Sequence, residues 1–241
     1  MVFKKGVSYL KMEPNLLRTY CCYCSAPLYR LNDGMGKCSR CKKKYSVDKI
    51  LTDFSVIDAF CGGNNANATA ESLKLSYVTV KKRYDLLRIL ITQHLEEKYQ
   101  QRTSDITEYE EYLYLEAAKR HEQRHIFDAH NFITFDCSGW IYTLMMPSLY
   151  RHKHQFLADN LENVYYDEFS KFLRLNRIAK LQKRNNKITL FWEFFESFIL
   201  QYRGVKPEYF AYYLKEAEFK FNYSASEQPD VLKSLWLAYK K

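Results

Sequence analysis

Short groups of β-forming residues make the first regular pattern in the chain. Residues 28–31 are rich in leucine and tyrosine, and Tyr45, Val47 and Ile50 follow further on. Between the two groups, residues 32–36 combine Asn, Asp and Gly, a composition typical of a hairpin turn. We therefore predict short antiparallel strands on either side of this turn.

The hydrophobic positions change to a helical period at Thr52. Phe54, Ile57 and Phe60 would share one face of a helix, because residues three apart lie one above the other. The run of Gly and Asn in residues 61–65 would end that helix. The pattern predicts one amphipathic helix here.

A pair of helices is predicted next. Residues 66–75 favour a short helix, and Ser76 is a suitable N-cap for a second helix in which Val80, Tyr84 and Leu87 share a face. This order is typical of a helix-turn-helix, whose second helix lies in the major groove of DNA. The candidates for DNA contact are Tyr77, Thr79, Lys81, Lys82 and Arg83. The alternative is an ordinary helical hairpin with a solvated basic face.

The remaining pattern favours strands followed by helices. Residues 92–106 are polar without a clear period, so they indicate a linker or the tail of a helix. Residues 131–146 predict a hairpin with Gly in its turn, and residues 106–114 could pair alongside it. Residues 188–202 and 208–221 predict two helices. This order indicates an α+β or α/β domain.

Length and composition indicate a folded, soluble protein. The chain has 241 residues, of which 47% are hydrophobic and 17% aromatic, so a sizeable core is available. It holds no run of the roughly eighteen apolar residues that a membrane span needs, and no secretory leader is recognisable. We expect a cytoplasmic protein with no membrane partner.

The positive charge is concentrated at one end of the chain. Residues 1–50 hold 11 Lys and Arg against 3 Asp and Glu, and this surplus of 8 is most of the formal net charge of +9. We divide the chain into residues 1–50, residues 51–98 and a third domain at 99–241. A small basic module suits the phosphate backbone of nucleic acid, and the alternative is a basic surface that serves solubility.

Two Cys-x-x-Cys pairs lie within the basic segment. Cys21, Cys24, Cys38 and Cys41 have the spacing of a four-thiolate zinc site, here a zinc ribbon. Four protein ligands leave no position open for a substrate water, so the zinc would be structural. The alternative is free or disulfide-bonded cysteines. Further candidates for DNA contact, directly after the last ligand, are Lys42, Lys43 and Lys44.

The order of these parts resembles that of zinc-ribbon insertion-sequence transposases with an RNase H-like DDE domain. The most specific motif is Asn186-Lys187-Ile188-Thr189-Leu190-Phe191-Trp192, which is followed by Gly204-Val205-Lys206-Pro207 and then by residues 213–222. The resemblance implies a zinc ribbon, a helix-turn-helix and an RNase H-like mixed sheet with helices. It also implies double-stranded DNA as a partner and a homo-oligomer on that DNA.

The resemblance further implies a two-metal active site in which three acidic residues hold Mg²⁺. The family's positions fall on Glu110, on Asp159 and on the motif that begins at Asn186. Thr189 stands where the family has its third acid, and Glu196 stands where it has a basic residue. Because a hydroxyl lacks the charge that attracts Mg²⁺, we expect impaired catalysis unless the amide of Asn186 substitutes for the acid.

Three functions are therefore open. The chain could be a transposase that cuts and joins DNA through Glu110, Asp159 and Asn186. It could instead be a domesticated, transposase-derived DNA-binding or regulatory protein without enzymatic activity. A zinc-ribbon module that binds only other proteins is the third.

Overall fold

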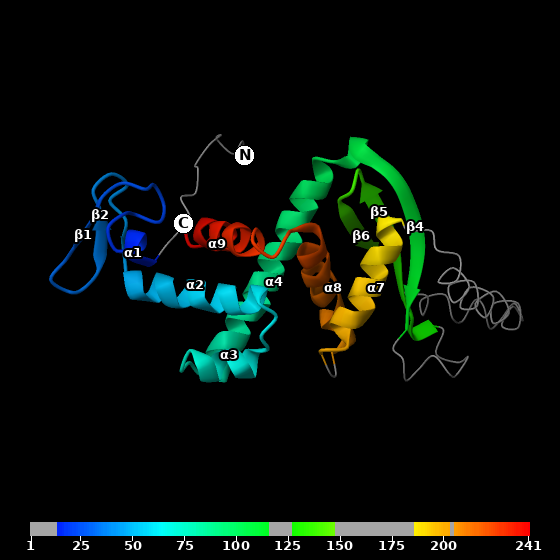
Figure 1. The fold of residues 1–241 in the computed structure, drawn as a ribbon, viewed down its shortest axis with the longest axis horizontal. Coiled ribbons are helices and arrows are strands. Elements are labelled where there is room, and N and C mark those ends of the chain that lie inside the picture. The colour runs from blue at the N-terminus through cyan, green and yellow to red at the C-terminus, as the bar shows by residue number, and fades with distance from the viewer. Residues whose placement is uncertain (1–13, 116–126, 148–185, 203–204) are drawn as a thin grey trace, which may run out of the picture. The chain divides into compact units, whose positions relative to one another are not determined.

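The computed structural model describes residues 14–115, 127–147, 186–202 and 205–241 (Figure 1). The chain divides into two compact units, the first made of residues 1–94 with 223–241 and the second of residues 95–222. Both helices and strands are present, so the α+β class is confirmed. No helix among the described residues is long and apolar enough to cross a membrane.

A small antiparallel sheet begins the first unit, after a single helical turn at α1 (Pro14–Leu17). Its strands, in the order in which they pair, are β1 (Leu28–Arg30), β2 (Gly36–Cys38) and β3 (Lys44–Tyr45). The predicted turn at residues 32–36 joins β1 to β2. Gly36, the first residue of β2, packs closely on Leu28, because a Cβ at this position would lie 2.7 Å from a side-chain carbon of that residue.

The prediction of strand at Val47 and Ile50 is wrong. Both residues lie in helix α2 (Val47–Cys61), where their spacing buries them on one face. The helix begins at Val47 because the hydroxyl of Ser46 accepts a hydrogen bond from the backbone N–H of Lys49. The β-branched side chains favoured a strand locally, but capping and burial favour the helix.

The two helices predicted after α2 are present. They are α3 (Ala66–Ser72) and α4 (Tyr77–Gln100), so residues 92–100 continue a helix and do not form a linker. Val80, Tyr84 and Leu87 are buried as their spacing predicted. The hydroxyls of Thr69 and Tyr84 lie 2.7 Å apart and join α3 to α4.

The last helix of the chain, α9 (Gln228–Tyr239), belongs to the first unit. Its buried Trp236 donates from Nε1 to Oδ2 of Asp53 on α2 at 3.2 Å. Oδ1 of the same carboxylate lies 2.6 Å from the guanidinium of Arg83 on α4. These three side chains connect α2, α4 and α9, so residues 223–241 pack apart from the rest of the predicted domain 99–241.

A second antiparallel sheet organises the second unit. Its strands are β4 (Ile106–Tyr114), β5 (His130–Cys137) and β6 (Ile141–Met145), paired in that order, and a short 3₁₀ turn (Thr103–Asp105) precedes β4. The predicted hairpin is therefore confirmed, with its turn at Gly139 in the left-handed region at φ +91°. The described strands pair only antiparallel, so this part of the chain does not show the mixed sheet that we expected.

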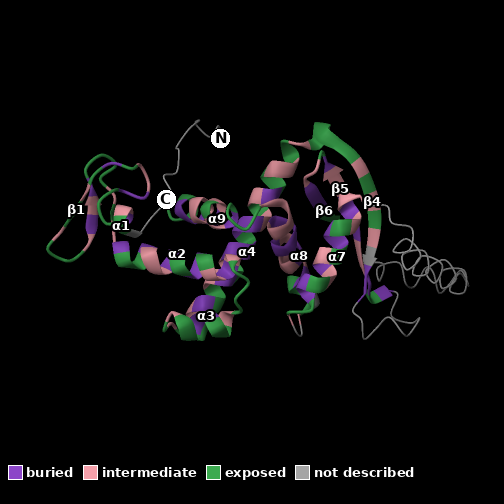
Figure 2. Ribbon diagram, viewed as in Figure 1, coloured by how far each residue is buried: buried purple, intermediate pink, exposed green. Residues whose placement is uncertain are grey.

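Helices α7 (Lys187–Ile199) and α8 (Pro207–Asn222) pack against each other and against this sheet (Figure 1). Their contact is largely aromatic, and Figure 2 shows buried positions along both helices. Trp192 stacks on Tyr112 with ring centroids 3.8 Å apart and donates from Nε1 to the hydroxyl of Thr134 at 3.0 Å. The aromatic residues of α7 are core, as their distribution over several helix faces indicates.

A buried ion pair joins α8 to β6. Lys215 Nζ lies 2.8 Å from Oε2 of Glu218, which also accepts from the backbone N–H and the hydroxyl of Thr143 at 3.0 and 2.7 Å. Burial raises the pKa of Glu218 and lowers that of Lys215, while the attraction between the two charges opposes both shifts. The ammonium also lies 3.5 Å from the ring centroid of Tyr142.

Candidate functional site

The four predicted ligands come together at one point of the first unit. The sulfurs of Cys21, Cys24, Cys38 and Cys41 all lie within 4.8 Å of one another. Cys24 Sγ lies 3.4 Å from Cys38 Sγ, and Cys21 Sγ lies 3.7 Å from Cys41 Sγ. Each pair draws one ligand from either Cys-x-x-Cys, so the two turns face each other across the cluster.

The backbone around the cluster favours thiolates. The N–H groups of Arg40 and Cys41 both donate to Sγ of Cys38 at 3.4 Å, and the N–H of Tyr23 donates to Sγ of Cys21 at 3.4 Å. Burial raises the pKa of Cys38, but these N–H groups outweigh it and leave the pKa at about 6. Burial raises the pKa of Cys21 to about 12.

The geometry fits a tetrahedral metal ion. Zinc bound by four thiolates at about 2.3 Å places the sulfurs roughly 3.8 Å apart, close to the separations observed here. The residues Ser25 and Lys42, which directly follow the second cysteine of each pair, have φ of 56° and 61°. These left-handed residues turn the chain back so that the sulfurs converge. The four cysteines could therefore bind a metal such as zinc.

The three lysines after Cys41, predicted as DNA contacts, have different surroundings. Lys42 Nζ donates to the backbone oxygen of Ser39 at 2.6 Å, and Lys44 Nζ lies 2.6 Å from a carboxylate oxygen of Asp33. The ammonium of Lys43 lies 4.5 Å from the ring centroid of Tyr23. Lys44 begins strand β3, whereas Lys42 and Lys43 precede it and Lys42 has a left-handed φ of 61°, so the three side chains have different partners.

The register of the first sheet reveals candidates that the sequence reasoning missed. Tyr29 pairs with Lys37, and Lys37 pairs with Lys44, so one residue from each strand lies in a row on the same face. Tyr29 is 46% exposed. We call these three residues the basic row. Only the pairing register brings them together, because they are distant in sequence.

The predicted contact residues of α4 differ in their surroundings. Tyr77, Lys81 and Lys82 are exposed, although Lys81 Nζ lies 2.9 Å from a carboxylate oxygen of Asp85. Thr79 is partly buried, and its hydroxyl lies 2.7 Å from that of Ser76 at the helix start.

Arg83 belongs to the interior of the first unit. Its side chain is only 16% exposed and pairs with Asp53 at 2.6 Å, so its position is that of a structural ion pair between α2 and α4. The basic residues of α4 that face solvent are thus Lys81 and Lys82.

The structure brings Asn186 and Glu110 together in the second unit. The side-chain amide of Asn186 donates from Nδ2 to Oε1 of Glu110 at 2.6 Å and to Oε1 of Glu108 at 3.1 Å. Glu108 and Glu110 lie on one face of β4 because they are two residues apart. Asp159 lies outside the described residues.

The amide oxygen of Asn186 caps helix α7. Asn186 is the N-cap of α7, and its Oδ1 accepts from the backbone N–H and the hydroxyl of Thr189 at 2.8 and 2.6 Å. A metal ligand would have to be this oxygen, whereas the N–H₂ group faces the carboxylates. Glu196, at the family's basic position, accepts from the hydroxyl of Tyr112 at 3.0 Å.

Comparisons with known proteins do not assign the chain to a family. No family model, no curated protein and no solved structure matches it. Within the described residues, the four cysteines are the one group of three or more Cys, His, Asp or Glu whose side chains could hold a metal ion together.

Proposed function

We propose that the protein binds double-stranded DNA, with a structural zinc ion in the four-cysteine cluster, and that it is a transposase-like protein of an insertion sequence with impaired catalysis. The observation that carries this proposal is the placement of charge. The surplus of 8 positive charges in residues 1–50 coincides with a metal-binding module whose sheet exposes the basic row of Tyr29, Lys37 and Lys44. The RNase H-like architecture and assembly on DNA as a homo-oligomer are parts of the same proposal.

The chemistry of the basic row supports a nucleic-acid partner. Lys37 and Lys44 are directly opposite each other, and like charges in that position repel. Asp33 offsets one of them, and a phosphate on the same face would stabilise both. Tyr29 adds an exposed ring beside the two ammonium groups, which suits contact with sugars or bases.

The helix that follows supports the same partner. The start of α4 exposes Tyr77 and the ammonium of Lys82, as a groove-binding helix requires. This surface and the basic row belong to the same compact unit. We therefore infer that the first unit contacts DNA through two basic surfaces, one on the ribbon and one on α4.

DNA binding by the full chain is expected to weaken steeply as salt rises, because released counterions supply the affinity. Lys37→Ala and Lys82→Ala should each reduce the slope of log affinity against log salt by about one. Fluorescence anisotropy with labelled duplex DNA at several salt concentrations measures this. Lys206→Ala, which removes an exposed lysine of the second unit, is the matched control and should leave the slope unchanged.

An affinity that is insensitive to a fourfold rise in salt would contradict the proposal. Identical slopes for Lys37→Ala and Lys206→Ala would exclude the basic row as a DNA contact. Complete absence of duplex binding at low salt would favour a module that binds only proteins.

The impaired catalysis is argued from the surroundings of Asn186. Two-metal chemistry needs carboxylates that gather and space the ions. Glu108 and Glu110 supply two, but the group that faces them is the N–H₂ of Asn186, a donor. This hydrogen bonding occupies Oε1 of both carboxylates without adding a third acid, and Thr189 adds no charge.

We expect the wild type to cleave DNA from the flanks of its own gene very slowly, because Thr189 supplies no third carboxylate and the amide of Asn186 occupies Glu108 and Glu110. A strand-cleavage and joining assay with Mg²⁺ or Mn²⁺ measures the rate. Thr189→Glu restores an acid at the family's third position and should raise it.

Asn186→Ser is the informative companion variant. Serine keeps an oxygen that can cap α7, but it removes the amide that faces Glu108 and Glu110. Robust cleavage by the wild type that is lost in Asn186→Ser would overturn the proposal of impaired catalysis. It would show that the chain is an active transposase that uses the amide.

A domesticated DNA-binding or regulatory protein is the second candidate, and the same geometry at Asn186 favours it. The two candidates share the DNA-binding surfaces and differ in their genomic setting. Inverted repeats and a target-site duplication around the gene would support the mobile element. A fixed neighbourhood without them would support the regulatory protein.

A further inference from the structure

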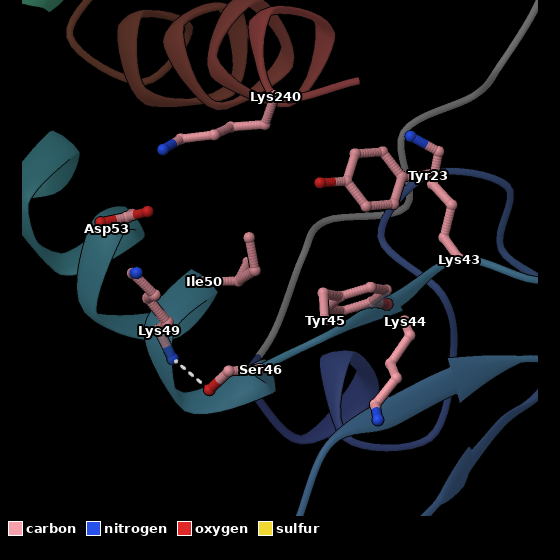
Figure 3. A pocket seen from close by; sticks show the side chains of 9 residues that line it. All are labelled: Tyr23, Lys43, Lys44, Tyr45, Ser46, Lys49, Ile50, Asp53 and Lys240. Carbon is pink, nitrogen blue, oxygen red and sulfur yellow. Dashed lines mark hydrogen bonds between the residues drawn. The ribbon is translucent and has the colours of Figure 1, made fainter.

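A pocket of about 310 Å³ lies within the first unit, beside the four-cysteine cluster (Figure 3). The ribbon, α2 and α9 all contribute to its wall. Its lining residues are Tyr23, Lys43, Lys44, Tyr45, Ser46, Lys49, Ile50, Asp53 and Lys240. Four of these nine side chains carry a positive charge and one carries a negative charge.

Several hydrogen-bond donors face the open space. Figure 3 shows Lys240 extending above this space, the hydroxyl of Tyr23 directed into it, and Lys49 at the α2 wall. Among the described residues, neither the ammonium of Lys49 nor the hydroxyl of Tyr23 has a hydrogen-bond partner or a salt bridge. The ammonium of Lys240 lies 5.0 Å from the ring centroid of Trp236, and within the described residues no hydrogen bond or salt bridge occupies its N–H donors.

The other charged groups of the wall have partners of their own. Asp53 forms an ion pair with Arg83 and accepts a hydrogen bond from Trp236, two residues that do not line the pocket. The guanidinium of Arg83 offsets its negative charge. Lys44 pairs with Asp33, and Lys43 donates to the backbone oxygen of Lys241 at 3.1 Å. Among the lysines of the wall, Lys49 and Lys240 are therefore the two for which the described residues give neither a hydrogen bond nor a salt bridge to the ammonium group.

We propose that this pocket binds a phosphate group. Two ammonium groups and a phenol are donors that match the acceptor oxygens of a phosphate, and charge-assisted hydrogen bonds of this kind are among the strongest that side chains make. A cation would be repelled by the ammonium groups of Lys49 and Lys240, and an apolar ligand would leave both ammonium groups without a partner. The volume suffices for a phosphate together with part of the molecule that carries it.

Two sources could supply this group. One is a backbone phosphate of nucleic acid, which would make the pocket a third contact of the proposed DNA interface. This version of the proposal rests on the proposed DNA-binding function. The other is a free nucleotide or inorganic phosphate, which requires no DNA binding. The chemistry of the pocket is the same for both.

The test uses the full chain and three variants. Lys49→Ala combined with Lys240→Ala removes the two ammonium groups, and Tyr23→Phe removes only the hydroxyl. Lys206→Ala is the control, because it removes an exposed ammonium group that does not line the pocket. Titration calorimetry at low salt with inorganic phosphate, with a nucleoside monophosphate and with a duplex DNA oligonucleotide measures each affinity. Circular dichroism verifies that every variant is folded.

At least one probe is expected to bind the double variant about tenfold or more weakly, and Tyr23→Phe about two- to tenfold more weakly. Loss of phosphate or nucleotide affinity identifies the free ligand as the source, whereas a loss confined to duplex DNA identifies the nucleic-acid backbone. If all three probes bind the pocket variants as they bind Lys206→Ala, the proposal is overturned.

The two proposals fail in different ways. If duplex DNA binds and depends on Lys37 and Lys82 but no probe depends on the pocket, the pocket proposal fails and the DNA-binding function stands. If the nucleotide binds through the pocket while duplex DNA does not bind at all, the reverse holds.

Discussion

Cys38→Ser is expected to unfold residues 20–50 while the second unit stays folded. The core cluster of the ribbon consists of Cys21, Cys38 and Ala26, with Tyr23, Cys24, Leu28 and Tyr45 partly buried against it. Two of these three are ligands, so the segment has little hydrophobic core without its metal. Structural zinc in comparable small peptides contributes about 10–16 kcal/mol of apparent binding free energy at neutral pH.

Amide hydrogen exchange read out by mass spectrometry should therefore show loss of protection in residues 20–50, and a strong chelator should reproduce it in the wild type. Cys61→Ser, the same chemical change in a cysteine outside the cluster, is the control and should retain both protection and metal. Equal protection in Cys38→Ser and Cys61→Ser would contradict a structural metal.

The same site predicts a pH dependence of metal affinity. Metal binding displaces protons from thiols, so the affinity must fall as the pH falls. Cys38, with a pKa of about 6 without metal, is already mostly thiolate at pH 7, whereas Cys21 must lose its proton on binding. Acidification should therefore release the metal.

Lys215→Met is expected to destabilise the second unit by about 3–5 kcal/mol, the usual cost of removing one partner of a buried ion pair. Glu218 is 0% exposed and would remain as a buried carboxylate without its cation. Its Oε1 already has no hydrogen-bond partner among the described residues. Since whole domains are stable by about 5–15 kcal/mol, this loss is a large fraction.

Urea unfolding monitored by circular dichroism measures the change. Lys81→Met breaks the exposed pair with Asp85 and should cost at most about 1 kcal/mol. Lys215→Met combined with Glu218→Gln should recover part of the loss, because glutamine has no charge and can still accept from Thr143. A loss for Lys215→Met no larger than that for Lys81→Met would exclude the pair as a support of α8.

Local signals in the sequence were sufficient for several elements. The hairpin of β5 and β6 follows from alternating hydrophobic residues around Gly139, and the buried face of α4 follows from Val80, Tyr84 and Leu87. Helices α7 and α8 were predicted within a few residues at each end. The four cysteines converge as their spacing predicted.

Other features depend on contacts that local sequence does not encode. Val47 is β-branched and favours a strand, yet the Ser46 cap and the buried face of α2 decide for a helix. The basic row requires the register of three strands. The ion pair between Arg83 and Asp53 requires the packing of α4 on α2. Each is a tertiary effect between residues far apart in sequence.

The last helix has a consequence for synthesis on the ribosome. A chain is made from its N-terminus, and domains generally fold as they emerge. Here the first unit cannot place Trp236 beside Asp53 until residues 228–239 have left the ribosome, after the entire second unit has been made. Nascent chains that already carry the four cysteines and α4 therefore still lack α9, and messages truncated after residue 94 would yield an incomplete first unit.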